Sequence, residues 1–281
     1  MCGNRENILF ADDTCLVYSD NDLAVLIEHV NDRLSIILDW CRYNKLAINP
    51  AKSEYMLVTT RPVLMEPRIL IGSDVVSRKS SVKYLGLFID DSLKFHSHVD
   101  QLKMKLSRFS GVVYRLRNFF NYRASKNFYY ACVYSALTYC ISVWGGALTS
   151  YRGAMLMKVH ERIVRNLFNK FNPGECPFKA NKLLKLADIH KLYVSIHMYK
   201  YIKHGESETV GDTLDLQTAY HSYNTRGRNL FRTPFPRVEA IRTSYKFQFL
   251  NVWNSIPDSV TVAESIRAFK RKLTDYLIEN Y

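Results

Sequence analysis

The sequence predicts an α+β protein, with a small antiparallel sheet and one helix in its first third and helices in the remainder. Three observations predict this fold class. Short apolar runs separated by turn residues surround a single amphipathic segment before residue 98. A three–four apolar repeat then starts at Val99, as in a long helix. The charges divide at the same place: residues 1–98 hold 11 Lys and Arg against 13 Asp and Glu, and residues 99–281 hold 28 against 13.

The first elements are predicted as a hairpin and a helix. Ile8–Phe10 and Thr14–Tyr18 have strand composition and are joined by a tight turn at Ala11–Asp13. Ser19–Asp22 offers helix caps, and Asn44 is expected to end the helix. Its apolar face consists of Leu23, Leu26, Ile27, Val30, Leu34, Ile37, Leu38 and Cys41.

Short strands complete the predicted first domain, residues 1–98. Turn residues at Arg61-Pro62 and Gly72–Asp74 separate them. The expected strands are Tyr55–Thr59, Arg68–Ile71, Val75–Val76 and Val82–Ile89.

A long helix, Val99–Phe120, is predicted to open a second domain, residues 99–171. Its narrow apolar seam consists of Val99, Leu102, Leu106, Phe109, Val113, Leu116 and Phe120. The other faces of this helix carry Lys103, Lys105, Arg108, Arg115 and Arg117. Further helices follow over residues 125–170, with a break at Gly145-Gly146.

The third predicted domain, residues 172–281, is basic and mostly helical. Asn172–Gly174 reads as a linker, followed by a helix over Pro177–His204. His221–Arg237 is rich in Arg and aromatic residues and is expected to be extended. The last helix is expected to begin at a capping box, Thr261-x-x-Glu264.

The excess of positive charge behind residue 98 indicates a polyanionic partner, and a solvated basic surface is the alternative. Six cysteines at irregular spacing, without a C-x-x-C pair, predict reduced and mainly buried thiols of an intracellular protein.

No signal peptide is evident, so the nucleus or the cytoplasm is expected. The uncharged segment Tyr129–Leu148 is interpreted as a buried helix, with a membrane span as the alternative.

Two adjacent carboxylates, Asp12 and Asp13, lie between the first two apolar strands. An ordinary polar turn is one interpretation, because Asp is a common turn residue. Carboxylates that project from a buried sheet are costly, however, and divalent cations would offset that cost. Mg²⁺ prefers carboxylate oxygen, and phosphoryl transfer uses a pair of such ions.

The box Phe10-Ala11-Asp12-Asp13 resembles the [FY]-x-D-D motif of reverse transcriptases, in the form typical of non-LTR, LINE-type retrotransposons. The segment Trp40–Met56 is similar to that family's next motif, W-x(n)-N-x-L-x-(I/L)-N-x-x-K-(S/T). Lys83–Asp90, "KYLGLFID", resembles the strand at the border between palm and thumb. The later segments Tyr139–Gly145, Tyr223–Arg226 and Leu250–Pro257 are similar to stretches downstream of the palm in these elements.

The resemblance implies a partial polymerase palm at 1–98, a thumb-like helical domain at 99–171 and an RNA-directed DNA polymerase activity. It makes Asp12 the direct ligand of Mg²⁺ or Mn²⁺ and Asp13 a second ligand. Lys52 becomes a proton donor or phosphate contact, and a surface lysine is the alternative. The implied substrates are an RNA/DNA template-primer and deoxynucleoside triphosphates, with no membrane partner; the oligomeric state stays open. The implied nucleic-acid contacts are Tyr84, Leu85, Gly86, Lys103, Lys105, Arg108, Arg115 and Arg117.

The sequence departs from the family pattern before the FADD box. Such enzymes need a third aspartate on an earlier palm strand and a fingers domain, and nine residues, Met1–Leu9, hold neither. Asp90-Asp91 is better explained as a turn. The chain is therefore expected to be an N-terminally truncated fragment that is inactive alone. The alternatives are a non-catalytic nucleic-acid-binding remnant and the product of a decayed element.

Overall fold

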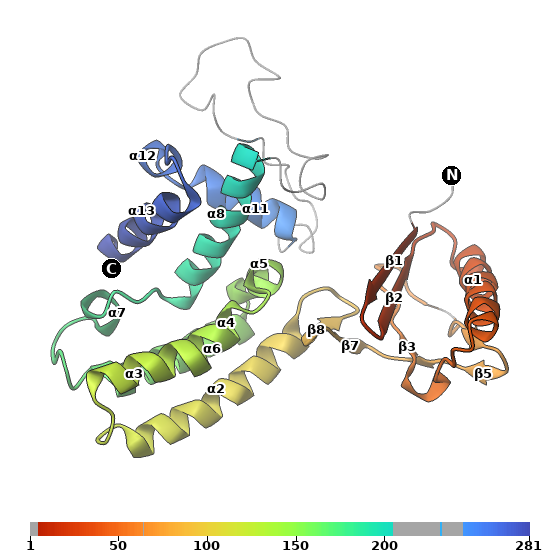
Figure 1. The fold of residues 1–281 in the computed structure, drawn as a ribbon, viewed down its shortest axis with the longest axis horizontal. Helices are drawn as coiled ribbons and strands as arrows, with labels where there is room; N and C mark the ends of the chain where they lie inside the picture. Colours follow the sequence, from red (N-terminus) through yellow and green to blue (C-terminus); the bar gives the residue numbers. More distant parts are fainter. Residues whose placement is uncertain (1–4, 64, 205–230, 232–243) are drawn as a thin grey trace, which may run out of the picture. The chain divides into compact units, whose positions relative to one another are not determined.

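The computed structural model describes residues 5–63, 65–204, 231 and 244–281 (Figure 1). The chain forms two compact units. Unit 1 comprises Met1–Leu85 with Asp90–Ser92, and unit 2 comprises Gly86–Ile89 with Leu93–Tyr281. Short strands and one helix make up the described part of unit 1, and helices dominate that of unit 2, so the α+β fold class is confirmed.

Unit 1 holds seven strands, one α-helix and one 3₁₀ turn within its described residues. These are β1 (Arg5–Phe10), β2 (Asp13–Tyr18), α1 (Leu23–Tyr43), η1 (Pro50–Lys52), β3 (Glu54–Tyr55), β4 (Leu70–Ile71), β5 (Asp74–Val75), β6 (Ser77–Arg78) and β7 (Ser81–Tyr84).

Six of the seven strands of unit 1 form three pairs within the unit. β1 and β2 form an antiparallel hairpin, and β4 and β5 form another. β3 pairs with β6 in parallel, so the prediction of a purely antiparallel sheet is wrong. The predicted strand Tyr55–Thr59 is also too long, because only Glu54–Tyr55 finds a partner strand. Local strand composition cannot extend a strand without a partner for its backbone.

A small core of three buried side chains, Ile69, Ile71 and Val76, supports α1. The apolar stripe of the helix packs onto it through Ile27, Val30, Leu34 and Leu38. Asp22 starts the helix, since its carboxylate accepts the N–H of Ala24 at 2.8 Å.

Unit 2 begins with a strand and continues as helices. The elements are β8 (Leu87–Asp90), α2 (His96–Leu116), α3 (Tyr122–Phe128), the π-helical segment η2 (Tyr129–Tyr134), α4 (Ser135–Thr138), α5 (Ile141–Trp144), η3 (Gly145–Thr149), α6 (Tyr151–Phe168), α7 (Pro177–Ala180), α8 (Leu186–His204), α11 (Tyr245–Asn254), α12 (Asp258–Thr261) and α13 (Ile266–Glu279).

Several predicted boundaries need correction. The predicted strand Val82–Ile89 is interrupted by Leu85 and Gly86, whose φ angles are +46° and +85°. The long helix ends at Leu116, and Leu116 is 40% exposed instead of closing the seam. The final helix is capped by Ser265, whose hydroxyl accepts the N–H of Ala268, and not by Thr261, which ends α12.

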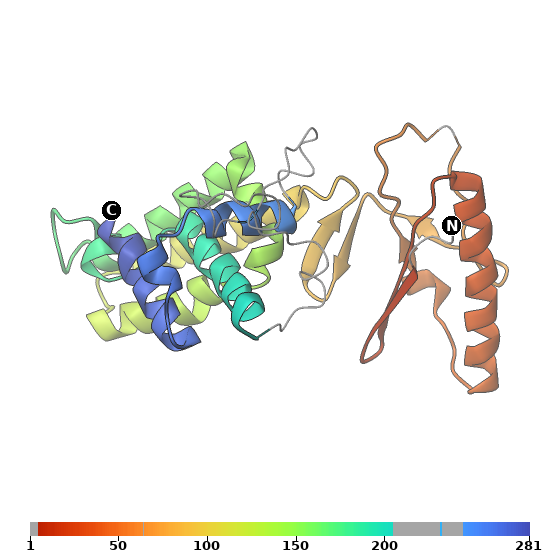
Figure 2. The same cartoon turned by 90° about the horizontal axis from the view of Figure 1, so that it is seen from above.

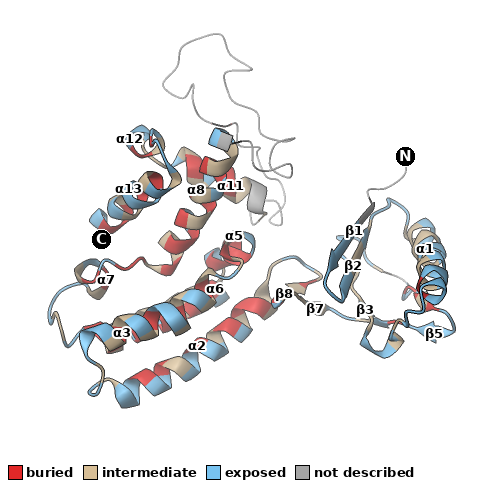
Figure 3. Ribbon diagram, in the orientation of Figure 1, coloured by how far each residue is buried: buried red, intermediate tan, exposed pale blue. Residues whose placement is uncertain are grey.

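The core of unit 2 lies between packed helices. α2 packs along α6, and α8 packs against α11 and α13 (Figure 2). Figure 3 shows the buried residues gathered on the facing sides of these helices. The predicted seam of α2 is confirmed between Val99 and Val113, where Val99, Leu102, Leu106 and Val113 are buried.

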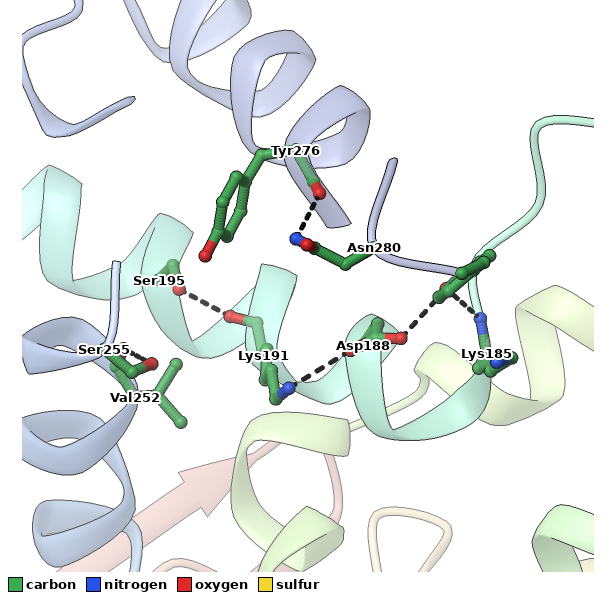
Figure 4. A network of polar contacts seen from close by, with 9 residues as sticks. Lys185, Asp188, Lys191, Ser195, Val252, Ser255, Tyr276 and Asn280 are labelled. Carbon is green, nitrogen blue, oxygen red and sulfur yellow. Dashed lines mark hydrogen bonds and ion pairs between the residues drawn. The ribbon is translucent and has the colours of Figure 1, made fainter. Parts of the chain in front are cut away.

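The last residue of the sequence, Tyr281, is hydrogen-bonded to the start of α8. Figure 4 shows Lys185, Asp188 and Lys191 of this network. Its hydroxyl donates to Asp188 at 2.9 Å and accepts the N–H of Lys185 at 2.7 Å. Lys191 in turn bonds to Asp188 at 3.2 Å. These residues line a hollow of about 390 Å³, and because its charged groups bond to one another, the hollow is a structural junction.

Two further expectations concern cysteines and membranes. Of the five cysteines among the described residues only Cys41 is buried, so the prediction of mainly buried thiols is wrong; all five are free. Within the described residues no single helix has the length and apolarity to cross a membrane, although Tyr122–Thr138 and Ile141–Thr149 pass that test together as a pair bent by 53°. The predicted helix Tyr129–Leu148 is broken at Tyr139-Cys140 and packs into the core.

Candidate metal-binding turn and nucleic-acid interface

Asp12 and Asp13 lie at the tip of the β1–β2 hairpin. Phe10 pairs with Asp13, so Ala11 and Asp12 form the two-residue loop between the strands. Ala11 takes a left-handed conformation with φ of 51°, which makes the reversal possible in two residues. Both carboxylates are exposed, and they have no hydrogen-bond or ion-pair partner among the described residues.

The surroundings of this turn differ from the expectation. Ile8, Leu9 and Phe10 are 42%, 72% and 60% exposed, and Val17 is 46% exposed. The carboxylates therefore do not project from a buried sheet, and the predicted cost of desolvating them is absent in this chain. What remains is a pair of oxygen donors of the type that Mg²⁺ prefers. No group of three or more His, Cys, Asp or Glu converges as a metal site within the described residues.

Tyr84, at the end of β7, is electrostatically coupled to the same hairpin. Its hydroxyl is buried and has no hydrogen-bond partner among the residues that the structure describes. Loss of solvent raises the pKa of the Tyr84 phenol, and the nearby Cys15 thiol and Asp13 carboxylate raise it further. Tyr84, which the resemblance puts at the grip on the primer, therefore lies within electrostatic range of Asp13.

Lys52 ends the η1 turn and is exposed. No interaction joins it to Asp12 or Asp13 among the residues that the structure describes. Its neighbours in the matched motif have local structural roles. Asn44 caps the end of α1 by donating to the Trp40 carbonyl at 2.8 Å, and Asn49 caps η1 by accepting the N–H of Ala51 at 3.0 Å.

Leu85 and Gly86 form a left-handed turn where the chain passes from unit 1 to unit 2. Gly86 suits this position because a φ of +85° is strained for residues with a Cβ. A Cβ at Gly86 would also lie 3.5 Å from the ring of Tyr139. The two residues thus have a conformational role whatever they contact in a complex.

Three of the five predicted basic residues of α2 share one exposed face. Lys105, Arg108 and Arg115 are spaced by three and seven residues, which brings them to one side of a helix, away from the buried seam. They extend over about 15 Å of helix, and none has a partner among the described residues. We call these three residues the α2 stripe.

The other two basic residues of this group are engaged. Lys103 pairs with Asp100 at 3.5 Å, and Arg152 from α6 also pairs with Asp100. The guanidinium of Arg117 lies 4.1 Å from the ring centroid of Tyr114. The structure therefore separates the five residues into a free stripe and two bonded positions, which the spacing alone did not decide.

The later matched segments pack the core of unit 2. The indole of Trp144 is fully buried and donates to the Tyr139 carbonyl at 2.8 Å. Gly145 touches His190 so closely that a Cβ there would lie 2.1 Å from its ring. Asn254 binds the backbone of Phe231 twice, accepting its N–H at 3.0 Å and donating to its carbonyl at 2.8 Å. The segment Tyr223–Arg226 lies outside the described residues.

Sequence reasoning missed one feature of unit 2. Residues 101–160 contain nine Lys and Arg and no Asp or Glu. Within this stretch Tyr114 and Phe119 are 58% and 83% exposed. The available signal was their position off the apolar seam in a segment without acidic residues.

The chain is similar to RNA-directed DNA polymerases of non-LTR retrotransposons, at a distant level and over about half of its length. It is 30% identical over 150 residues to a probable RNA-directed DNA polymerase from transposon BS of Drosophila melanogaster, covering 50% of this chain. It is 31% identical over 100 residues, or 34% of this chain, to a probable RNA-directed DNA polymerase from transposon X-element of the same species. A Pol polyprotein from the type-1 retrotransposable element R1 of Bradysia coprophila is 25% identical over 165 residues, 56% of this chain.

These matches cover only a small part of the relatives. The aligned residues span 16%, 11% and 16% of the lengths of the three proteins. No protein-family model matches the chain, and no solved structure gives a significant match.

Proposed function

We propose that this chain is part of an RNA-directed DNA polymerase of a non-LTR retrotransposon. In this proposal unit 1 contributes a portion of the palm, and the helices within residues 99–171 contribute the thumb. The observation that carries the proposal is the pair Asp12-Asp13 at a two-residue hairpin tip, in a chain distantly similar to three retrotransposon polymerases.

Asp12 and Asp13 would hold Mg²⁺ or Mn²⁺ in the complete enzyme. The ion would activate the attacking hydroxyl and stabilise the leaving oxygen of nucleotidyl transfer. Exposed carboxylates on a hairpin suit this task, since Mg²⁺ is commonly bound by one or two carboxylates together with substrate phosphates. The 281 residues alone are expected to be inactive, because two carboxylates without a third leave the charge of the transition state poorly stabilised.

The α2 stripe would hold the backbone of the template-primer. Lys105, Arg108 and Arg115 can meet phosphates without breaking an existing ion pair, whereas Lys103 would have to leave Asp100. A binding remnant without catalysis is the second candidate, and it uses the same stripe without the metal.

The metal-binding role is tested by measuring affinity for a primed RNA–DNA hybrid with and without Mg²⁺ at constant ionic strength. The parent chain is expected to bind several-fold more tightly with Mg²⁺, because Asp12 and Asp13 would hold an ion whose positive charge attracts the phosphates. Asp12→Asn/Asp13→Asn should lose this Mg²⁺ effect.

Asp32→Asn/Asp39→Asn, which removes two exposed carboxylates of α1, is the matched control and should respond to Mg²⁺ as the parent does. An unchanged Mg²⁺ response in the Asp12/Asp13 variant would remove metal binding from this turn and favour the remnant.

A further inference from the structure

A second surface of unit 2 combines exposed rings with cations. It is the corner where α2 ends and α3 begins, residues 114–126, and we call it the α2–α3 corner. It carries Arg115, Arg117, Arg123 and Lys126, and Asp100 and Glu161 are the nearest acidic residues along the sequence. The local charge therefore attracts polyanions without opposition from the same segment.

The rings at this corner are more exposed than packing requires. Phe119 is 83% exposed and Tyr114 is 58% exposed. The next residue shows the contrast, because Phe120 turns inward and its ring lies 5.6 Å from that of Phe128. An exposed phenyl group costs free energy in water, so Phe119 offers a binding surface without contributing to the core.

The backbone that carries Phe119 is fixed from two directions. The ammonium of Lys170, which follows α6, donates to the carbonyls of Arg117 and Phe120. Asn121 caps α3 by accepting the N–H of Ala124 at 2.8 Å. A ligand would therefore meet a surface that needs little ordering when it binds.

Cations lie against the neighbouring rings. Arg117 stands 4.1 Å from the centroid of Tyr114, and the ammonium of Lys126 stands 5.0 Å from that of Tyr122. The Tyr122 ring is itself held edge-on by Phe171, at 5.4 Å. Alternation of aromatic faces and cations along one segment is the chemistry that binds unpaired nucleotides, whose bases stack while their phosphates meet positive charge.

We propose that the α2–α3 corner binds single-stranded nucleic acid by stacking unpaired bases on Phe119 while Arg117, Arg123 and Lys126 hold the phosphates. The proposal rests on the nucleic-acid-binding part of the proposed function and adds a site for strands that are not in duplex. Bases inside a duplex are already stacked on one another, so a protruding phenyl ring selects the unpaired part of a template or primer.

Fluorescence anisotropy with two probes of equal length tests the proposal. One probe is oligothymidylate, and the other has the same backbone without bases. Phe119→Ala is expected to weaken oligothymidylate binding by at least about fivefold and to leave binding of the abasic probe unchanged. Phe119→Trp should restore the affinity, since a larger ring stacks at least as well.

Tyr151→Ala is the matched control, because Tyr151 is 79% exposed on α6 of the same unit. It should bind both probes as the parent does. Equal affinity of the parent for the two probes, or an unchanged affinity of Phe119→Ala for oligothymidylate, would overturn the proposal. So would loss of binding to vesicles of anionic lipid in Phe119→Ala without any effect on oligothymidylate, which would make the corner a membrane contact.

The outcomes separate this proposal from the proposed function. If Phe119→Ala leaves oligothymidylate affinity unchanged while hybrid binding still depends on Lys105 and Arg108, only the stacking proposal is refuted. If Phe119→Ala weakens oligothymidylate binding, but hybrid affinity depends neither on the α2 stripe nor on Mg²⁺, the polymerase assignment fails. The α2–α3 corner then remains a binding site for single strands.

Discussion

Three buried histidines make unit 2 sensitive to acid. His160 is enclosed, with its Nε2 3.1 Å from the Tyr129 hydroxyl, and burial lowers its pKa to about 3. Burial lowers the pKa of His98 to about 4, and both of its ring nitrogens lack hydrogen-bond partners within the described part of the chain. The pKa of His190 falls to about 4 through burial and, to a smaller extent, through Lys191. All three are therefore neutral in the folded protein at pH 7.

The direction of the pH effect follows from these pKa values. Each pKa is depressed on folding, so the unfolded chain takes up more protons between pH 6.5 and about 4. Above pH 6.5 the histidines are neutral in both the folded and the unfolded state, and the folded protein has its full stability. As the pH falls from 6.5 to about 4, the unfolded chain is protonated first and the free energy of unfolding decreases. Each histidine with a folded pKa near 4 costs about 2 kcal/mol of stability at pH 5.

His98→Phe is predicted to reduce this acid sensitivity. The His98 ring packs 5.3 Å from the ring of Trp144, so Phe can keep the contact. The replacement breaks no hydrogen bond to a described residue, because both ring nitrogens of His98 are unpaired there. Urea unfolding followed by circular dichroism at pH 7.5 and pH 5 should show a loss on acidification that is smaller by about 2 kcal/mol than in the parent. An equal loss in parent and variant would mean that His98 is not buried as a neutral ring.

Among the elements, the sequence located the helices with clear periodicity and misjudged where several of them end. The repeat from Val99 identified α2, since four positions of the repeat, Val99, Leu102, Leu106 and Val113, are buried. Thr and Ser are both common helix caps, so composition alone does not tell which of Thr261 and Ser265 starts the last helix. In the structure Thr261 ends α12 and Ser265 caps α13. The strands were harder, because a pairing such as β3 with β6 depends on contacts between distant residues.

For the candidate site too, the sequence predicted the local structure but not the burial or the pairing of side chains. The hairpin turn with Asp12 and Asp13 follows from local composition and lies where expected. The exposure of Leu9 and Phe10 does not follow, because burial is set by whatever else packs on a strand. The free face of α2 could be derived from helical geometry, but the pairing of Lys103 and Arg152 with Asp100 required the fold.

The linker after α6 is predicted to be cut before the helices on either side of it. Pro173, Gly174 and Glu175 are exposed, and Gly174 takes a φ of +87°. Limited digestion with a glutamate-specific protease should cleave after Glu175 before it cleaves after Glu161, which lies inside α6. Glu161 is an internal control for intrinsic cleavage, and earlier or equal cleavage there would contradict the packing of α6 against α2.

At the scale of the whole molecule, the charge is divided between the units. The acidic turn belongs to unit 1, whereas the α2 stripe and the α2–α3 corner belong to unit 2 and share Arg115. The proposed function gives the two kinds of charge different tasks, since the carboxylates would hold metal ions and the basic side chains would hold phosphates. If the basic residues only form a solvated surface, removing the α2 stripe should not change nucleic-acid binding. If the stripe holds phosphates, removing it should weaken that binding.

Salt titration of the parent chain and of Lys105→Ala/Arg108→Ala, with a duplex or RNA–DNA hybrid, separates these interpretations most directly. Neutralised phosphates release counterions, so log affinity falls linearly with log salt concentration and the slope counts the contacts. The matched control is Lys270→Ala/Arg271→Ala, which removes the same charge from exposed positions of α13. If the α2 stripe holds the duplex, the slope should fall by about one to two units for every nucleic-acid sequence, while the control keeps the parent slope. Equal slopes for the parent and a folded Lys105/Arg108 variant would contradict nucleic-acid binding by this helix.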